Sequence, residues 1–257
     1  MKVATWNVNS LSARMPRFLA WLEEIEPDVV CIQETKLKPD AFPHLQLETL
    51  GYESAGFGQG QWNGVAVISR VGLSDPLYGV EISGESEEAR GITVNCNGVG
   101  IVSVYVPNGR ALENDHYKYK LQWLSHLREH LDRHFKPSDK VIVAGDFNIA
   151  PEDKDVWSPE AMLGCTHVSE PEREAFRSLI DWGLVDALRH FYDQDKIYTW
   201  WDHRAGAFHK RQGMRIDHIL VTKPIESELN WAIVDRNARK GEKPSDHAPV
   251  IIDFSMP

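Results

Sequence analysis

The sequence of 257 residues is poor in cysteine, has no long hydrophobic run and carries fewer basic than acidic residues. Its three cysteines, Cys31, Cys96 and Cys165, show neither a CxxC motif nor the Cys/His spacing of a zinc site, which favours a reducing interior. No apolar run reaches the length of a membrane span, and the first residues lack the apolar stretch of a signal peptide. We therefore expect a cytoplasmic, nucleoid-associated protein without a membrane partner.

The shortage of positive charge argues against one class of function. Thirty-eight acidic residues face 28 basic ones, so the formal net charge is −10. Tight non-specific binding to nucleic acid needs a cationic surface, which this total does not supply, although a local basic patch or a bound cation is compatible with it. No low-complexity linker and no block of like charge divides the chain. Residues 1–257 are therefore expected to form a single domain.

Hydrophobic periodicity predicts a mixture of strands and helices. Apolar or β-branched runs predict strands at 2–8, 28–34, 64–69, 91–96, 99–106, 140–146, 215–221, 230–235 and 249–254. Apolar residues at spacings of three and four predict helices at 17–26 and 117–135. Ser169 and Glu172 have capping-box spacing before a third helix, which Gly183 would end. This pattern predicts an α/β fold of two packed sheets flanked by helices.

Short polar clusters lie at the ends of six predicted strands. They contain Asn7 and Asn9, Glu34 and Lys36, Tyr105, Asn108 and Arg110, Asp146 and Asn148, Asp217, and Asp246 and His247. Ligand sites of open α/β sheets gather at the carboxyl ends of strands, so these side chains are expected to converge. Carboxylate and amide oxygens without thiols suit Mg²⁺ or Mn²⁺, and a His–Asp pair suits base catalysis or charge stabilisation. The clusters together predict metal-assisted hydrolysis of a phosphate ester.

Each cluster also has an ordinary structural explanation. A carboxylate at a strand end is commonly just solvated, an Asn after a strand commonly forms a turn, and Asp246 with His247 suits a turn cap. Recurrence at six strand ends favours a functional site instead. Asp217 favours it further, because it interrupts an apolar strand where an unpaired carboxylate is costly.

The segment 198–217 is basic and aromatic, on a chain that is otherwise acidic. Between His203 and Arg215 it contains no acidic residue. Its basic residues are Arg204, Lys210, Arg211 and Arg215, interleaved with Trp200, Trp201, Phe208 and Met214. Such a patch can follow a phosphate backbone while the remaining surface stays acidic. The alternative is a solvated loop held in place by two buried tryptophans.

Seven motifs in order resemble the exodeoxyribonuclease III family of apurinic/apyrimidinic endonucleases. They are WNVNS, QETK, QWNGVAV, YVPNGR, GDFNIAP, GMRIDHIL and SDHAPV, and the resemblance runs from residue 1 to about residue 253. The SDH motif is shared by the whole endonuclease/exonuclease/phosphatase superfamily, whereas YVPN-G and RID-x-IL are more specific to its DNA-repair branch. The resemblance implies a four-layer sandwich, in which two sheets are flanked by helices, and a Mg²⁺- or Mn²⁺-dependent nuclease.

The resemblance also implies roles for the matched residues. The implied metal ligands are Asn7, Glu34, Asp146, Asn148, Asp246 and His247. The implied catalytic residues are Tyr105, Asp146, Asn148, Asp217 and His247. The implied DNA contacts are Lys36, Asn108, Arg110, Trp200, Arg204, Lys210, Arg211, Met214 and Arg215. Among these, Asp146 would position or deprotonate the attacking water, and His247, oriented by Asp217, would stabilise the charge on the scissile phosphate.

The implied activity is cleavage of the phosphodiester 5′ to an abasic site in duplex DNA, with removal of 3′ nucleotides or 3′ blocking groups, by a monomer. Trp200, Met214 and Ile216 would line a pocket for the flipped-out sugar. At Asn9 some relatives carry Asp, and at Met214 others carry Trp or Leu, so the number of metals and the tightness of the pocket stay open. Two rival functions are a phosphatase for small phosphoesters and a DNA-binding protein without turnover.

Overall fold

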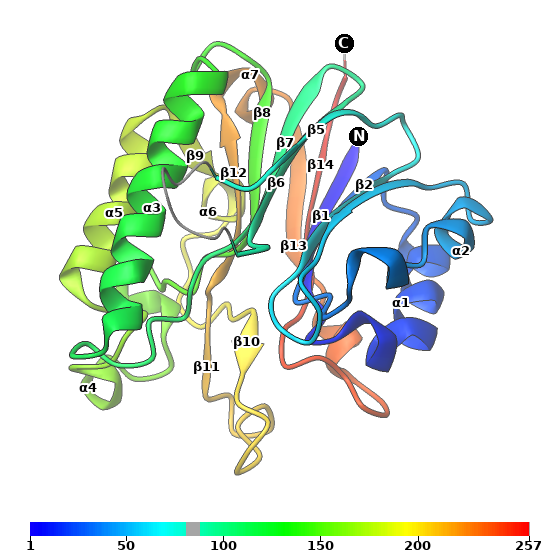
Figure 1. Ribbon diagram of the computed structural model, residues 1–257. Coiled ribbons are helices and arrows are strands. Elements are labelled where there is room, and N and C mark those ends of the chain that lie inside the picture. The colour runs from blue at the N-terminus through cyan, green and yellow to red at the C-terminus, as the bar shows by residue number, and fades with distance from the viewer. Residues whose placement is uncertain (81–87, 257) are drawn as a thin grey trace.

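Two six-stranded β-sheets lie face to face in the computed structural model, with helices on the outer face of each (Figure 1). The structure describes residues 1–80 and 88–256. The first sheet has the order β13 (Leu229–Val234), β14 (Val250–Phe254), β1 (Lys2–Asn7), β2 (Val29–Gln33), β4 (Val65–Ser69) and β3 (Glu53–Phe57). The second has the order β5 (Ser74–Tyr78), β6 (Gly91–Cys96), β7 (Val99–Tyr105), β8 (Val141–Asp146), β12 (Asp217–Thr222) and β9 (Leu184–Asp186). This arrangement confirms the predicted α/β sandwich of four layers.

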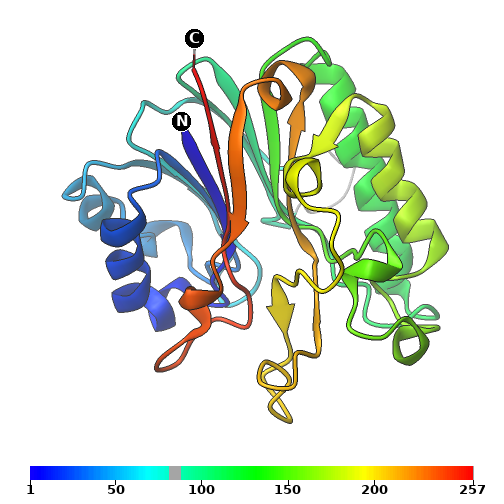
Figure 2. The same cartoon turned by 180° about the vertical axis from the view of Figure 1, so that it is seen from behind.

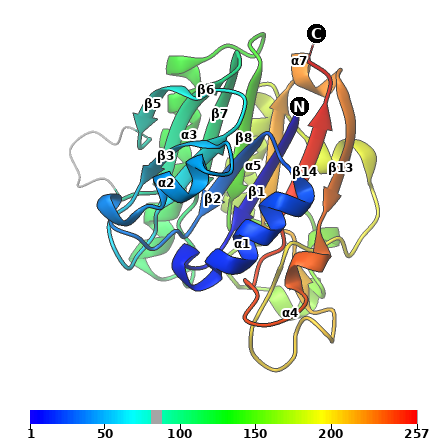
Figure 3. The same cartoon turned by 90° about the vertical axis from the view of Figure 1, so that its right-hand side faces the viewer.

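Helices form the two outer layers (Figures 1 and 3). Helices α1 (Leu11–Ile25) and α2 (His44–Glu48) lie outside the first sheet, and α3 (Asp115–His134) and α5 (Glu170–Asp181) lie outside the second (Figures 1 and 3). The shorter helices are α4 (Pro159–Met162), α6 (Ala187–Phe191) and α7 (Lys223–Glu226), and 3₁₀ turns cover Pro39–Ala41, Asp153–Asp155 and Arg236–Arg239. No helix in the described part of the chain is long and apolar enough to cross a membrane.

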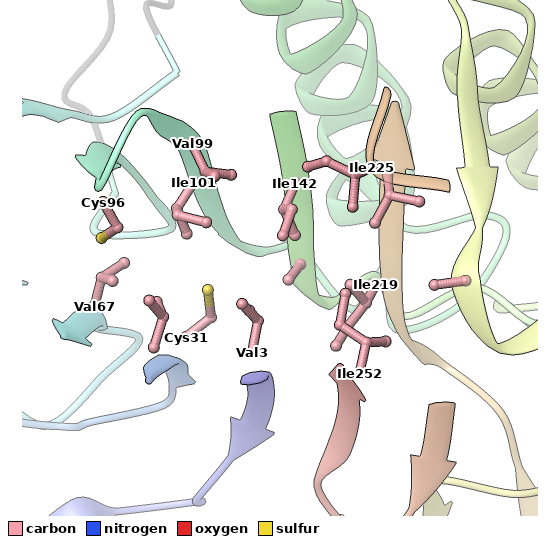
Figure 4. Close-up of a cluster of buried hydrophobic side chains, with 14 of the residues drawn as sticks. Val3, Cys31, Val67, Cys96, Val99, Ile101, Ile142, Ile219, Ile225 and Ile252 are labelled. Atoms are coloured by element: carbon pink, nitrogen blue, oxygen red, sulfur yellow. The ribbon is translucent and has the colours of Figure 1, made fainter. Parts of the chain in front are cut away.

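Apolar side chains fill the space between the layers. The cluster between the two sheets includes Cys31, Cys96, Ile142 and Ile252, all fully buried or nearly so (Figure 4). Both cysteines are free thiols, and burial raises the pKa of each thiol above its usual value, so neither is a reactive thiolate at neutral pH. Two further clusters lie beneath α1 and beneath α3 and α5. Both faces of each sheet are thus buried, which explains the continuous apolar runs of its central strands.

The predicted strands are all present, with ends that differ from the prediction by no more than two residues. Asn97 and Gly98 both have positive φ, of 51° and 82°, as a two-residue hairpin turn between β6 and β7 requires. Helix α1 begins at Leu11 rather than at residue 17, because the Ser10 side chain caps it and the exposed Pro16 is accommodated inside it. The shorter elements had not been predicted, since few residues give too little periodicity to detect.

The topology brings several strand ends to one edge of the sandwich. Strands β1 and β2 are parallel, as are β7 and β8, so their carboxyl ends lie on the same side. Strand β12 runs antiparallel to β8 and therefore begins at this edge. A small ribbon of β10 (Trp200–Trp201) and β11 (Gly213–Met214) projects from the same edge, at the bottom of the views in Figures 1 and 2.

Candidate active site

Polar side chains from both sheets meet at this edge. Asn7 ends β1 and Glu34 follows β2, which is its parallel neighbour. In the second sheet, Asp146 ends β8 and is paired in register with Asp217, the first residue of β12. His247 lies just before β14 and contacts both of these carboxylates. The structure therefore brings together residues that are up to 240 positions apart in the sequence.

Three of these residues form a candidate metal centre. Glu34, Asp146 and His247 each offer one ligand atom, and these atoms lie within 4.8 Å of one another. The amide Nδ2 of Asn7 donates hydrogen bonds to Glu34 Oε1 (2.8 Å) and Asp146 Oδ2 (2.9 Å), and so holds the two carboxylates together. Two carboxylates joined by an amide, without a thiol, match the oxygen ligands that Mg²⁺ and Mn²⁺ prefer.

His247 is held as a cation. Its Nδ1 lies 3.0 and 2.9 Å from the two carboxylate oxygens of Asp217, and its Nε2 lies 3.8 Å from Asp146 Oδ2. Burial lowers the pKa of His247, but the carboxylates of Asp217 and Asp146 outweigh it and raise this pKa to about 10. Burial raises the pKa of Asp146 above its usual value, reinforced by Asp217 and opposed by His247. A protonated imidazole binds phosphate and not metal, so Glu34 and Asp146 suit the cation better than His247 does.

Tyr105 and Asn148 flank the same centre. Burial, together with the negative charges of Glu34 and Asp146, keeps the pKa of the Tyr105 phenol well above its usual value, so its hydroxyl stays protonated. The guanidinium of Arg90 lies 4.7 Å from the centre of the Tyr105 ring. Asn148 donates its backbone N–H to Asp146 Oδ1 (2.9 Å) and its side-chain Nδ2 to the Val106 carbonyl (2.9 Å). Both side chains are thus fixed beside the carboxylates, as the sequence predicted.

A polar network extends from the carboxylates toward the β10–β11 ribbon. Lys36 forms an ion pair with Glu34 (2.8 Å) and donates to Asn9 Oδ1 (2.6 Å). Burial raises the pKa of Glu34, but Lys36 outweighs it and the pKa is lowered overall. Asp246 accepts from Asn9 Nδ2 (2.9 Å) and from Trp200 Nε1 (3.1 Å). Asp246 therefore lies outside the group of Glu34, Asp146 and His247, and it positions Asn9 and Trp200.

A cavity of about 710 Å³ opens beside this centre. Its lining includes Arg110, His167, Trp200, Arg204 and Met214. Arg110 and Arg204 are exposed, as are Asn108, which lies against His167, and Lys210 and Arg211 in the loop between β10 and β11. The structure thus gathers predicted DNA contacts from two distant loops around one opening.

One predicted DNA contact is wrong. Arg215 is only 1% exposed, and its guanidinium donates to Asp155 (2.7 and 3.1 Å) and Asp186 (2.5 Å). Arg215 lies between β11 and β12, and its side chain turns away from the exposed loop and into the protein, against Asp155 and Asp186. A guanidinium that is buried and paired with two carboxylates is not free to bind phosphate, so this residue stabilises the fold beneath the ribbon.

One residue of the site was missed. His167 Nε2 lies 3.2 Å from both Asn148 Oδ1 and Asn108 Nδ2, and its Nδ1 lies 2.6 Å from the Thr166 carbonyl. Burial, followed by the charge of Lys120, lowers the pKa of His167 to about 4, so the ring is neutral. Since Nδ1 then donates to Thr166, Nε2 is the acceptor for Asn108. The sequence carried no signal for it, because a lone His in a polar loop belongs to no pattern.

Comparison with known proteins identifies this type of site. A model of the Endonuclease/Exonuclease/phosphatase family matches residues 4–247. The chain is 30% identical to exodeoxyribonuclease III of Haemophilus influenzae over 99% of its own length and 100% of that protein. It superposes with a TM-score of 0.96 on the 3′ phosphatase NExo from Neisseria bound to a product DNA hairpin, at 39% identity. It also superposes with a TM-score of 0.96 on an AP endonuclease from Archaeoglobus fulgidus, at 35% identity. Both comparisons cover 100% of this chain and 100% of the other. The chain therefore belongs to this family of hydrolases, in the branch of exodeoxyribonuclease III and the AP endonucleases.

Proposed function

We propose that the chain is a Mg²⁺- or Mn²⁺-dependent DNA-repair nuclease that acts at abasic sites and at 3′ ends of duplex DNA. The main support is the group of Glu34, Asp146 and His247 within 4.8 Å, beside a cavity with cationic and aromatic walls. We also propose that the protein acts as a monomer. Such a role would place the protein at the nucleoid in the cytoplasm.

The residues of the chain divide the chemistry among them. Glu34 and Asp146, with Asn7 beside them, would hold a divalent cation, which when bound would provide a Lewis acid at the phosphate. Protonated His247, fixed by Asp217, donates Nε2–H to a phosphate oxygen and stabilises the charge that develops there. Asp146 positions the attacking water and accepts its proton.

Selection of DNA rests on exposed basic residues at the cavity and in the loop between β10 and β11, and on apolar residues that line the cavity. Arg110, Arg204, Lys210 and Arg211 are exposed and suit contacts with phosphates on both sides of the cleaved bond. Trp200 and the buried Met214 are paired across the ribbon and present apolar surface to the cavity. A sugar without its base fits such a surface, and unstacking costs least where the base is already lost.

A second candidate is preference for terminal 3′ phosphoesters over internal abasic sites. His167 supports it, because its ring lies against Asn148 and Asn108 and would narrow the space there for a strand that continues past the cleaved phosphate. A phosphate at a strand end does not need to pass this ring. The similarity to the Neisseria 3′ phosphatase agrees with this preference.

The test compares three duplexes in one gel assay: one with an internal abasic analogue, one with a 3′ phosphate at a nick, and one intact. Hydrolysis of either damaged duplex, abolished by EDTA and restored by Mg²⁺, supports the proposal. Turnover of a soluble phosphoester with no preference for damaged DNA would favour the small-molecule phosphatase. Binding of abasic DNA without turnover would favour the DNA-binding protein. Faster release of the 3′ phosphate than abasic incision, with the ratio reversed in His167→Ala, supports the second candidate.

A further inference from the structure

A fully buried ion pair lies behind the site and takes no part in the proposed chemistry. Lys120 on α3 and Glu172 on α5 form a salt bridge, and both side chains are 0% exposed. Such a pair is expensive to bury, and an apolar pair of similar volume packs as well or better. We propose that Lys120 and Glu172 are positioning residues that hold Asn108, Asn148 and His167 in place for the reaction.

Lys120 holds the loop that follows β8. Its Nζ donates to Glu172 Oε1 and to the backbone carbonyl of Asn148 at 2.7 Å. Asn148 has a φ of 52°, in the left-handed region that a side chain other than glycine seldom adopts. A backbone in this conformation persists only where its surroundings hold it. The hydrogen bond from Lys120 is one such restraint, and it acts on the residue that contacts Asp146.

Glu172 holds a second loop, which carries His167. Its Oε1 also accepts from Thr166 Oγ1 (2.7 Å) and from the backbone N–H of His167 (2.9 Å). Its Oε2 accepts the backbone N–H of Ser169 (3.1 Å), which completes the capping box of α5. The sequence spacing of Ser169 and Glu172 predicted the helix cap but none of the other hydrogen bonds of Glu172. The cap occupies one carboxylate oxygen, and the other oxygen serves Lys120, Thr166 and His167.

The third loop follows β7 and carries Asn108. It is connected to Glu172 through Thr166. Thr166 Oγ1 lies 3.1 Å from the Asn108 carbonyl, so its single hydrogen is shared between that oxygen and Glu172. At Gly109, a Cβ would lie 2.6 Å from Thr166 Oγ1 and 3.2 Å from Lys120 Cδ. Only glycine allows this loop to approach so closely, particularly at its φ of +85°. The loop is thereby placed directly against the ion pair.

The side chains from the three loops meet one another. Asn108 Nδ2 donates to Asn148 Oδ1 (3.1 Å) and lies 3.2 Å from His167 Nε2. Lys120 and Glu172 do not line the cavity themselves. They therefore act through Asn108, Asn148 and His167, and the inference rests on the proposed function of these three residues.

The first test removes one hydroxyl from the network. Thr166→Val keeps the size of the side chain and removes its hydrogen bonds, whereas Thr166→Ser retains the hydroxyl and removes only a methyl group. For whichever damaged duplex the wild type cleaves, we expect Thr166→Val to lower kcat about tenfold and to change KM less than twofold, because small displacements near reacting groups act mainly on the chemical step. Thr166→Ser should recover most of the loss. A Thr166→Val enzyme with wild-type kcat would overturn the inference.

The second test removes both charges together. Lys120→Met with Glu172→Gln avoids leaving one buried charge alone, and Gln retains an acceptor for the His167 N–H. We expect this double variant to fold with a circular dichroism spectrum like that of the wild type, and to lose at least tenfold in kcat. Adding Asn148→Ala should lower kcat less than it does in the wild type, since coupled groups are not additive. The control is Lys118→Met with Asp115→Asn, an exposed pair on α3.

The outcomes separate the inference from the proposed function. If the wild type hydrolyses no DNA phosphoester, the proposed function fails first. If the wild type is active and the folded double variant matches it in kcat and KM, the ion pair is structural only and the inference is wrong. If the double variant does not fold, the comparison of Thr166→Val with Thr166→Ser decides.

Discussion

Replacing Arg215 by Met tests whether the buried ion pairs of Arg215 with Asp155 and Asp186 stabilise the fold. Arg215→Met keeps much of the side-chain volume and removes a guanidinium that is 1% exposed and bonded to Asp155 and Asp186. Burial raises the pKa of each carboxylate, but Arg215 outweighs it and holds both pKa values below their usual range. Removing one partner of a buried ion pair costs about 3–5 kcal/mol, since the other charge is left buried.

The expected loss of stability is large enough to measure directly. Urea unfolding followed by circular dichroism should show a free energy of unfolding lower by about 3–5 kcal/mol. For a domain of this size the midpoint of thermal unfolding should fall by about 6–20 °C. Arg189 also contacts Asp155 and partly compensates, which favours the lower half of this range.

DNA binding supplies the second half of the test. Because the guanidinium of Arg215 does not reach the surface, Arg215→Met should leave the salt dependence of DNA affinity unchanged at a temperature where it is folded. Arg211→Met is the matched control: Arg211 is exposed in the same segment, so its loss should reduce the slope of log affinity against log salt by about 0.9 and barely change stability. An Arg215→Met protein of wild-type stability with a reduced salt slope would refute the reasoning.

Three further predictions follow from the site and its surroundings. Asp217→Asn should lower kcat on the order of 100-fold in single-turnover assays, with DNA affinity retained, because His247 loses the charge that keeps it protonated. An unchanged rate would show that Asp217 and His247 do not act as a pair in the mechanism. Glu34→Gln should weaken Mn²⁺ binding, measured by calorimetry, at least tenfold, and equal affinity would show that the cation binds elsewhere. The pKa values of Asp155 and Asp186 are lower in the folded state than the value of about 4 in the unfolded chain. Their contribution to stability is therefore complete above about pH 4 and is lost as pH falls toward their pKa values in the folded state. Between pH 7 and pH 3, the midpoint of thermal unfolding should therefore fall less in Arg215→Met than in the wild type.

The sequence by itself determined the layers of this protein and most of its site. Central strands such as β2 and β8 are buried on both faces, so their apolar runs are continuous and easily detected. Polar residues directly after such runs, Glu34 after β2 and Asp146 at the end of β8, are also local signals. Very short elements, such as β10 and β11 with two residues each, were not detectable, because so few residues do not establish a period.

Only the tertiary structure decided which charges face the solvent and which face one another. Arg211 and Arg215 are four residues apart in one basic segment, yet one is exposed and the other pairs with Asp155, 60 residues away. Glu172 has a local partner in Ser169, but its partner Lys120 lies 52 residues away on another helix. Local patterns report the period of a segment and the cap of a helix. The pairing of buried charges depends on packing between distant segments, which no local pattern records.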